Sequence, residues 1–206
     1  PRRTSRRAAR GGGTERIDLR RTLAAAGRLD GEVVVPLRRG RRRTRRRVVL
    51  LADVSGSMAP YAQALLRFGH VGVRAAGAEV FTVGTHLTRV TAQLADLRPD
   101  RAVSRAAAAT PDWRGGTRLG VGIDQFVRTW GRRGLARGAV VVVLSDGWER
   151  DDPQALGDAV AVLARLAHRL VWVNPLRASP GYRPLAAGMA AVLPHCDRFL
   201  DGHSLA

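Results

Sequence analysis

Four short runs of the sequence consist almost entirely of β-branched and other apolar residues. They are Val48–Ala52, Val80–Val83, Val140–Leu144 and Val171–Val173. The apolar residues of each run are nearly continuous rather than alternating with polar ones. Strands that are covered on both faces of a parallel sheet have this pattern. We therefore predict that these runs are buried strands of one sheet.

Amphipathic stretches separate the apolar runs. We expect helices at Met58–Ala75, Arg118–Trp130 and Pro153–Leu170. Alternating strands and helices are typical of crossover connections, so the predicted fold class is α/β, with a doubly wound, mostly parallel sheet and helices on both faces. The segment Thr85–Thr91 follows one predicted strand directly after Gly84. This spacing predicts a hairpin, and therefore one antiparallel strand at an edge of the sheet.

The first 47 residues differ in composition from the rest of the 206-residue chain. Residues 1–47 hold 17 arginines against 4 acidic residues, whereas residues 48–206 hold 18 against 13, and the net charge of the whole chain is +18. We divide the chain into a basic, Arg-rich leader, residues 1–47, and one globular domain, residues 48–206. All basic residues are arginine, and alanine and glycine are abundant. This composition is typical of a GC-rich genome and weakens a functional interpretation of the charge.

The leader has few residues that could form a buried core, so we expect it to be partly disordered. Residues 1–14 are expected to be mobile, and Ile17–Ala26 to form a short helix. Val33–Val35 is expected to add an edge strand, and Arg38–Arg47 to be an exposed connector.

Side chains that carry oxygen follow the predicted strands. Asp53, Ser55 and Ser57 occupy alternate positions directly after the first strand, around Gly56, which permits a sharp turn. Thr117 follows Gly115 and Gly116 before a predicted helix, and Asp146 follows the strand Val140–Leu144. Ligands of open α/β sheets bind at the carboxyl ends of the strands. We therefore expect these five side chains to surround one point.

Two carboxylates and three hydroxyls, without imidazole or thiolate, favour a hard cation. We predict Mg²⁺, with Mn²⁺ or Ca²⁺ as alternatives, because magnesium keeps several waters and needs few carboxylates. Ser55 and Ser57 are assigned as direct ligands, and Thr117 as a direct or water-bridged ligand. Asp53 and Asp146 are expected to bind largely through water. A carboxylate from another molecule could then complete the coordination shell.

These residues resemble the metal-ion-dependent adhesion site of von Willebrand factor A domains. More narrowly, the chain is similar to the CoxE-like branch of that family in Val48–Met58, Phe81–Thr91, Trp113–Gly120, Leu144–Arg150 and Asp201–Leu205. The resemblance implies a protein–protein interaction adaptor that is not an enzyme. It also implies a MoxR-type AAA+ ATPase as a partner, and a role in the maturation or cofactor insertion of a metalloenzyme such as carbon monoxide dehydrogenase. The client would offer an acidic side chain.

Two other functions are weighed against the adaptor. A magnesium-dependent phosphatase is disfavoured because the position two residues after Asp53, where a phosphoaspartyl enzyme usually has a second acid, is Ser55. The five histidines lie outside the three loops, which leaves no expected base for a serine nucleophile. No catalytic residues are therefore assigned, nor any residues for an organic cofactor.

A nucleic-acid-associated protein is the second alternative. The arginine run Arg38–Arg47 could attract phosphates, but such attraction is general to basic tails. The run also lacks aromatic residues that could stack on bases. We therefore do not expect nucleic acid to be the partner.

The loops that carry the five predicted ligands are flanked by Trp113, Trp148 and Glu149. We predict that these three residues form a rim that contacts the partner protein.

The remaining sequence features concern location. No apolar run approaches the ~20 residues needed to span a bilayer. Arg20 and Arg21 are not followed by the apolar segment that a twin-arginine signal needs, so we expect a cytoplasmic protein. The single cysteine, Cys196, is interpreted as a small buried apolar residue. The chain begins at Pro1 rather than at methionine, and a helical region often precedes the domain in the CoxE-like family. We therefore expect this chain to be part of a longer protein.

Overall fold

The computed structural model describes residues 2–10, 16–28, 36–111, 118–178 and 187–202. The chain divides into two compact units, residues 1–46 and residues 47–206, which we call unit 1 and unit 2. The expected boundary between leader and domain lies one residue later, at position 47. Among the described residues, no helix is both long and apolar enough to cross a bilayer.

Unit 2 contains a six-stranded sheet in the order β6-β5-β4-β7-β8-β9. Its strands are β4 (Val48–Asp53), β5 (Glu79–Val83), β6 (Leu87–Arg89), β7 (Val140–Leu144), β8 (Arg169–Asn174) and β9 (Arg198–Asp201). Every pairing is parallel except that of β5 with β6. The predicted mostly parallel sheet with one antiparallel edge strand is confirmed.

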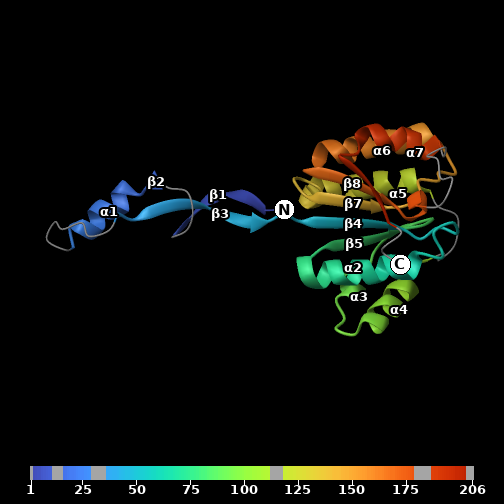
Figure 1. Ribbon diagram of the computed structural model, residues 1–206, viewed down its shortest axis with the longest axis horizontal. Helices are drawn as coiled ribbons and strands as arrows, with labels where there is room; N and C mark the ends of the chain where they lie inside the picture. The colour runs from blue at the N-terminus through green and yellow to red at the C-terminus, as the bar shows by residue number, and fades with distance from the viewer. Residues whose placement is uncertain (1, 11–15, 29–35, 112–117, 179–186, 203–206) are drawn as a thin grey trace. The chain divides into compact units, whose positions relative to one another are not determined.

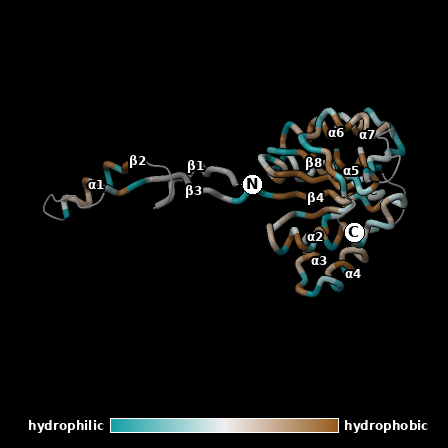
Figure 2. Tube along the Cα trace, viewed as in Figure 1, coloured by the Kyte–Doolittle hydropathy of each residue, from teal (hydrophilic) through white to brown (hydrophobic). Residues whose placement is uncertain are grey.

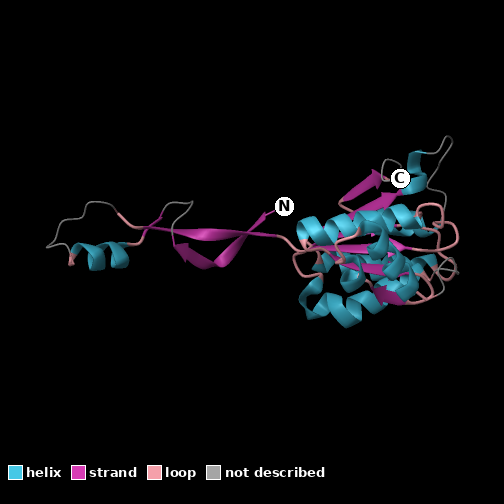
Figure 3. Cartoon of the chain, turned by 90° about the horizontal axis from the view of Figure 1, so that it is seen from below, coloured by secondary structure: helices cyan, strands magenta, loops and turns pink. Residues whose placement is uncertain are grey.

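Helices cover both faces of this sheet. One face carries α2 (Ala62–Ala76), α3 (Thr91–Leu94) and α4 (Pro99–Ala109), and the other carries α5 (Leu119–Phe126), α6 (Pro153–Leu166) and α7 (Ala187–Val192) (Figure 1). The view in Figure 3, which faces the first group, shows helices in front of the strands. The described residues of unit 2 also form the helical segments η1 (Val127–Leu135), η2 (Pro175–Ala178) and η3 (Leu193–His195).

The sheet strands supply the centre of the core, as their continuous apolar runs predict. The central strands are coloured as hydrophobic along their length in Figure 2. Phe81, Phe126 and Trp172 are fully buried on the side of α5 and α6. Leu66 and Leu94 are fully buried on the other side, between the sheet and α2 to α4.

The predicted helices differ from the observed ones at their ends. The first helix begins at Ala62 instead of Met58, because residues 56–61 form turns in which the Met58 amide donates to the Ser55 carbonyl. The helix after Arg118 continues to Leu135 because a wider π-helical segment, η1, follows α5. The third helix ends at Leu166 because the chain then enters β8 at Arg169.

Unit 1 contains β1 (Arg2–Arg10), β2 (Arg16–Ile17), α1 (Leu19–Ala26) and β3 (Arg38–Arg45). The short helix was predicted, and Asp18 caps it by accepting a hydrogen bond from the Arg21 amide. The prediction of a connector at Arg38–Arg47 was wrong for Arg38–Arg45, which form β3 and pair with β1 in antiparallel fashion. The mobility expected of residues 1–14 stays a prediction. The strand expected at Val33–Val35 lies outside the described residues.

Candidate metal site

The site is built on two neighbouring parallel strands. Asp53 is the last residue of β4, and Ser145 follows the last residue of β7. These strands pair in register, with Ala52 opposite Leu144. Their carboxyl ends therefore lie side by side, and the two loops that follow them leave the sheet at the same edge.

The carboxylate of Asp53 joins these two loops. Asp53 is only 1% exposed, and its Oδ1 accepts a hydrogen bond from the Ser55 amide at 2.9 Å. Its Oδ2 accepts a hydrogen bond from the Ser145 hydroxyl at 2.6 Å. Ser145 Oγ in turn accepts from the Gly147 amide at 3.0 Å. The loop after β7 is thus fixed to the loop after β4 through one side chain.

Burial raises the pKa of Asp53 from 3.8 to about 6. Removal of the carboxylate from water is the main cause, and the nearby charge of Asp146 acts in the same direction. Hydrogen bonds from Ser145 and Ser55 oppose the rise without cancelling it. Two buried carboxylates that repel each other are an environment in which a bound cation stabilises the ionised form.

Ser55 and Ser57 place their hydroxyls next to each other. Their Oγ atoms lie 3.1 Å apart, with Ser55 buried and Ser57 exposed. Magnesium is bound octahedrally at 2.0–2.1 Å, so neighbouring oxygens in its shell are about 3.0 Å apart. The separation of the two hydroxyls matches two adjacent ligands of such a shell. The residues present therefore fit the cation that their chemistry predicted.

Asp146 is also held in place at this edge. It is 7% exposed, and its Oδ1 accepts a hydrogen bond from the Trp148 amide at 3.0 Å. Asn174, at the end of β8, donates from Nδ2 to the Asp146 carbonyl at 3.1 Å. The Trp172 indole donates to the Ser145 carbonyl at 2.9 Å. Two residues of the neighbouring strand therefore fix the backbone on which Asp146 sits.

Three residues of this arrangement were not predicted as parts of the site. Ser145 is a hydroxyl residue between a buried strand and Asp146, which is a signal that sequence reasoning could have used. Asn174 ends a strand that is apolar from Leu170 to Val173, and it is a buried polar residue with 0% exposure. Trp172 gives no such signal, because its contact with the loop depends on the pairing of β7 with β8.

Two of the predicted residues, Thr117 and Trp113, lie outside the described residues. Their roles as ligand and rim residue stay predictions. The described part of the chain contains no group of three or more histidine, cysteine, aspartate or glutamate side chains that could hold a metal ion. A site here therefore depends on hydroxyl ligands.

The other two rim residues differ from each other. Trp148 is 53% exposed beside the site. Glu149 is half-buried, and its Oε2 accepts from the Gly120 amide at 2.7 Å. Its Oε1 accepts from the amides of Arg150 and Asp151 at 2.9 Å and 3.1 Å. Glu149 thus connects the loop after β7 to the start of α5, and its contact with a partner stays a prediction.

Comparison with solved structures supports the fold. A von Willebrand factor type A protein from Catenulispora acidiphila matches with a TM-score of 0.58 and 15% identity, over 82% of this chain and 42% of that one. Proximal thread matrix protein 1 from the mussel byssus matches with a TM-score of 0.51 and 12% identity, over 79% and 45%. A structure of that mussel protein with a zinc-occupied MIDAS motif has a TM-score of 0.48 and 17% identity, over 76% and 41%. This chain spans less than half the length of each.

Comparison of the sequence with family models gives a match over the whole chain. No curated protein matches it significantly. The model described as "VWA domain containing CoxE-like protein" matches residues 1–206, which includes unit 1 as well as the sheet domain. The chain therefore belongs to the family of CoxE-like proteins that contain a von Willebrand factor A (VWA) domain.

Proposed function

We propose that the chain is a metal-dependent adaptor that binds other proteins through the carboxyl edge of its sheet and has no catalytic activity of its own. The observation that carries this proposal is the arrangement around Asp53. A fully buried carboxylate, the adjacent hydroxyls of Ser55 and Ser57, and the buried Asp146 converge there. Membership of a VWA family supports the same conclusion.

Magnesium is the proposed ion. Ser55 and Ser57 would bind it directly, while Asp53 and Asp146 would hold its waters, and Thr117 would complete the set. The ion supplies a positive charge that a foreign carboxylate can bind. Because the direct ligands are neutral, the chain itself cancels little of that charge. The ion would therefore attract an acidic side chain of a partner into its coordination shell.

The proposed partners are a MoxR-type AAA+ ATPase and a client metalloenzyme. In this scheme the adaptor acts in the cytoplasm and brings ATP-driven remodelling to the client during maturation or cofactor insertion, with carbon monoxide dehydrogenase as the example. Membership of the CoxE-like family supports this choice. The exposed indole of Trp148 would add an apolar contact beside the ion, as aromatic residues commonly do at the centre of interfaces.

The first experiment tests the ion. Titration calorimetry with MgCl₂ should give one site in the wild-type chain, and saturating Mg²⁺ should raise its melting temperature by about 5 °C, since a ligand that binds only the folded state stabilises it. Ser55→Ala should lose both effects. Ser104→Ala is the matched control, because Ser104 is an exposed serine on α4. Equal responses of the two variants would remove Ser55 from the site.

The second experiment tests the partner. Immobilised chain is mixed with the purified MoxR-type ATPase encoded in the same genome, in Mg²⁺ and in EDTA. We expect the wild-type chain to capture the ATPase in Mg²⁺ only. The Ser55→Ala and Asp53→Ala variants should not capture it, although their circular dichroism spectra should be those of folded proteins. Equal capture in both buffers would exclude the metal from the interaction. Absence of capture in both would exclude this ATPase as the partner.

A further inference from the structure

The edge of the sheet opposite the metal site is rich in arginine. Parallel strands begin at the same edge, and in unit 2 most of these starts carry an arginine. Arg47 precedes β4, Arg137 lies shortly before β7, and Arg169 and Arg198 open β8 and β9. Arg132 and Arg133 lie at the end of η1, and all six are exposed. We call these six residues the arginine edge.

Acidic residues do little to neutralise this edge. Glu79 opens β5, but its carboxylate is paired with Arg89 at 2.7 Å. Asp197 precedes β9, and its Oδ2 accepts a hydrogen bond from the Leu170 amide at 2.7 Å. Among the described residues, neither forms an ion pair with the arginine edge. The edge therefore offers an uncompensated positive surface to an anionic partner.

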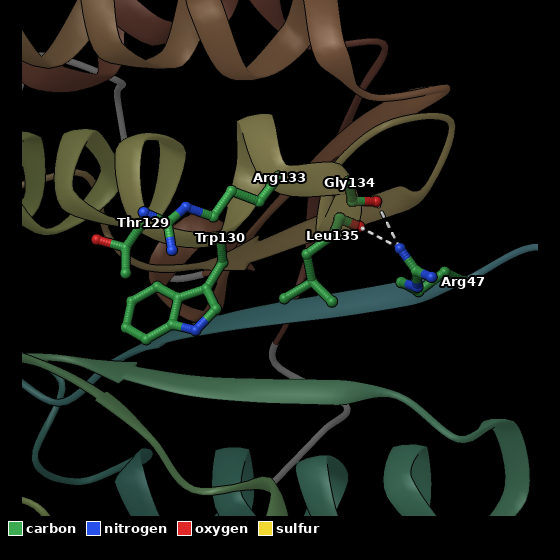
Figure 4. Close-up of a pocket in the computed structure, with 6 residues that line it drawn as sticks. All are labelled: Arg47, Thr129, Trp130, Arg133, Gly134 and Leu135. Atoms are coloured by element: carbon green, nitrogen blue, oxygen red, sulfur yellow. Dashed lines mark hydrogen bonds between the residues drawn. The ribbon is translucent and has the colours of Figure 1, made fainter.

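A pocket of about 400 Å³ opens at this edge. Its lining residues are Arg47, Thr129, Trp130, Arg133, Gly134 and Leu135. The Arg133 guanidinium lies at the end with Thr129 and the Trp130 ring, the Arg47 guanidinium lies at the other end, and Leu135 lies between these ends (Figure 4). The pocket thus combines an apolar centre with a positive charge at each end.

The arginines at the two ends of the pocket differ: Arg47 is held by hydrogen bonds to the backbone, whereas Arg133 can bind a ligand. Arg47 Nη1 donates to the Gly134 carbonyl and, at 3.5 Å, to the Leu135 carbonyl, which caps the end of η1. Gly134 has a φ of 114°, a conformation that glycine adopts readily and other residues rarely. The Arg133 guanidinium has no hydrogen-bond or ion-pair partner within the described part of the chain. Its donors are free to bind a ligand.

We propose that the arginine edge is a second docking surface, which binds an acidic peptide segment carrying an apolar side chain between carboxylates. The apolar side chain enters the pocket beside Trp130 and Leu135. A carboxylate of the segment accepts a bidentate hydrogen bond from Arg133, a geometry that arginine forms well. The edge lies about 20 Å from the metal site, the length of a six-residue strand, so the two surfaces can be occupied together.

The arrangement of the aromatic rings favours a peptide over nucleic acid. Base stacking needs an open aromatic face. The Trp130 ring lies 5.0 Å from the Phe81 ring and is stacked on Phe126 at 6.5 Å. Trp130 thus contacts two rings of the core, and it is the one aromatic residue among those that line the pocket. A single ring of this kind offers little platform for the stacking of successive bases, whereas an aliphatic side chain can pack against it and Leu135.

The experiment uses the full chain in EDTA, so that carboxylates cannot bind through the metal site. A fluorescein-labelled peptide, Gly-Asp-Glu-Leu-Glu-Asp-Gly, is titrated and followed by anisotropy. Arg133→Gln should weaken binding at least about fivefold, as loss of a charge-assisted pair at an interface does. Arg150→Gln is the matched control, since it removes the same charge from an exposed position in the loop after β7. It should change binding less than twofold.

Spectra of ¹⁵N-labelled chain locate the peptide. The indole N–H signal of Trp130, assigned with Trp130→Phe, should shift on addition of peptide, whereas that of Trp148 should not. Equal weakening by both arginine variants, or no shift of the Trp130 signal, would overturn the proposal. Tighter binding of a labelled random DNA duplex than of the peptide, again lost in Arg133→Gln, would also overturn it in favour of nucleic acid.

Discussion

At the scale of single residues, the site depends on side chains that are buried together with their hydrogen-bond partners. Asp53 is 1% exposed and is held by Ser55 and Ser145. Burial of a charge without a partner is costly, and burial with several donors costs less. The carboxylate is therefore held in one position before any ligand arrives. The same physical effect, removal of an ionisable group from water, acts on Cys196 at a place unrelated to the site.

The thiol of Cys196 should be unreactive in the folded chain. Burial, with a smaller effect of the Asp197 charge, raises its pKa from 9.0 to about 12. Its thiol also donates to the Val192 carbonyl at 3.3 Å. The thiolate is the reactive form, so labelling by Ellman's reagent near pH 8 should be at least about tenfold slower in native protein than in urea. Equal rates would show that the thiol is accessible.

The same shift gives a pH dependence of stability. The folded state holds the thiol proton more tightly than the unfolded state does, so this contribution is fully present below pH 9.0 and is lost as pH rises towards about 12. The free energy of unfolding, measured in urea, should therefore fall between these values. Cys196→Ala should fall less steeply. Identical slopes for the two proteins would contradict the prediction.

At the scale of elements, the sheet edge and its loops are positioned by backbone geometry. Gly147, directly after Asp146, has a φ of 75°. A Cβ atom there would lie 2.1 Å from Met189 Sδ, and Met189 is fully buried in α7. A side chain at this position would therefore have to displace the buried Met189 side chain and adopt a strained backbone conformation. The packing of α7 and the conformation of the metal loop are coupled at this point.

Gly147→Ala should destabilise the fold more than a substitution at another glycine of positive φ. Gly77 is the matched control, because its φ is 61° and a Cβ there would meet nothing within 4 Å. Backbone strain alone should cost about 1–2 kcal/mol in Gly77→Ala. Gly147→Ala should cost roughly 1–3 kcal/mol more because of overpacking against Met189. Urea denaturation measures both, and equal losses would indicate that α7 moves aside.

At the scale of the whole molecule, the chain consists of two compact units with different compositions. Unit 2, residues 47–206, contains the six-stranded sheet, the candidate metal site and the arginine edge. The core clusters consist only of residues from unit 2. The buried apolar area that stabilises the sheet therefore does not depend on unit 1. The family match nevertheless includes both units, at residues 1–206.

A fragment of residues 47–206 should fold by itself. Because the cores lie within unit 2, we expect one cooperative thermal transition and an unfolding free energy within about 1 kcal/mol of that of the full chain. Its Mg²⁺-induced stabilisation should equal that of the full chain. The measurement is differential scanning calorimetry with and without Mg²⁺. A fragment without a cooperative transition would show that unit 1 is part of the folding unit.

The sequence by itself determined the strands β4 to β8 of the sheet and the fold class. Runs such as Val140–Leu144 need cover on both faces, and this requirement is local. The sequence did not predict β9, which is short and follows no apolar run. It also did not predict the pairing of β1 with β3. Neither element has a strong pattern of apolar side chains, and in β9 Phe199 packs against the core only because the strand pairs with β8.

Only the tertiary structure decided which residues meet. Ser145 lies 92 positions from Asp53 in the sequence, yet their side chains form a hydrogen bond because β4 and β7 are parallel neighbours in register. The same parallel pairing gathers arginines from separate strand starts at the opposite edge. Hydrophobic periodicity specifies that strands exist, whereas strand order and register, which depend on packing of the whole chain, determine which loops become a site.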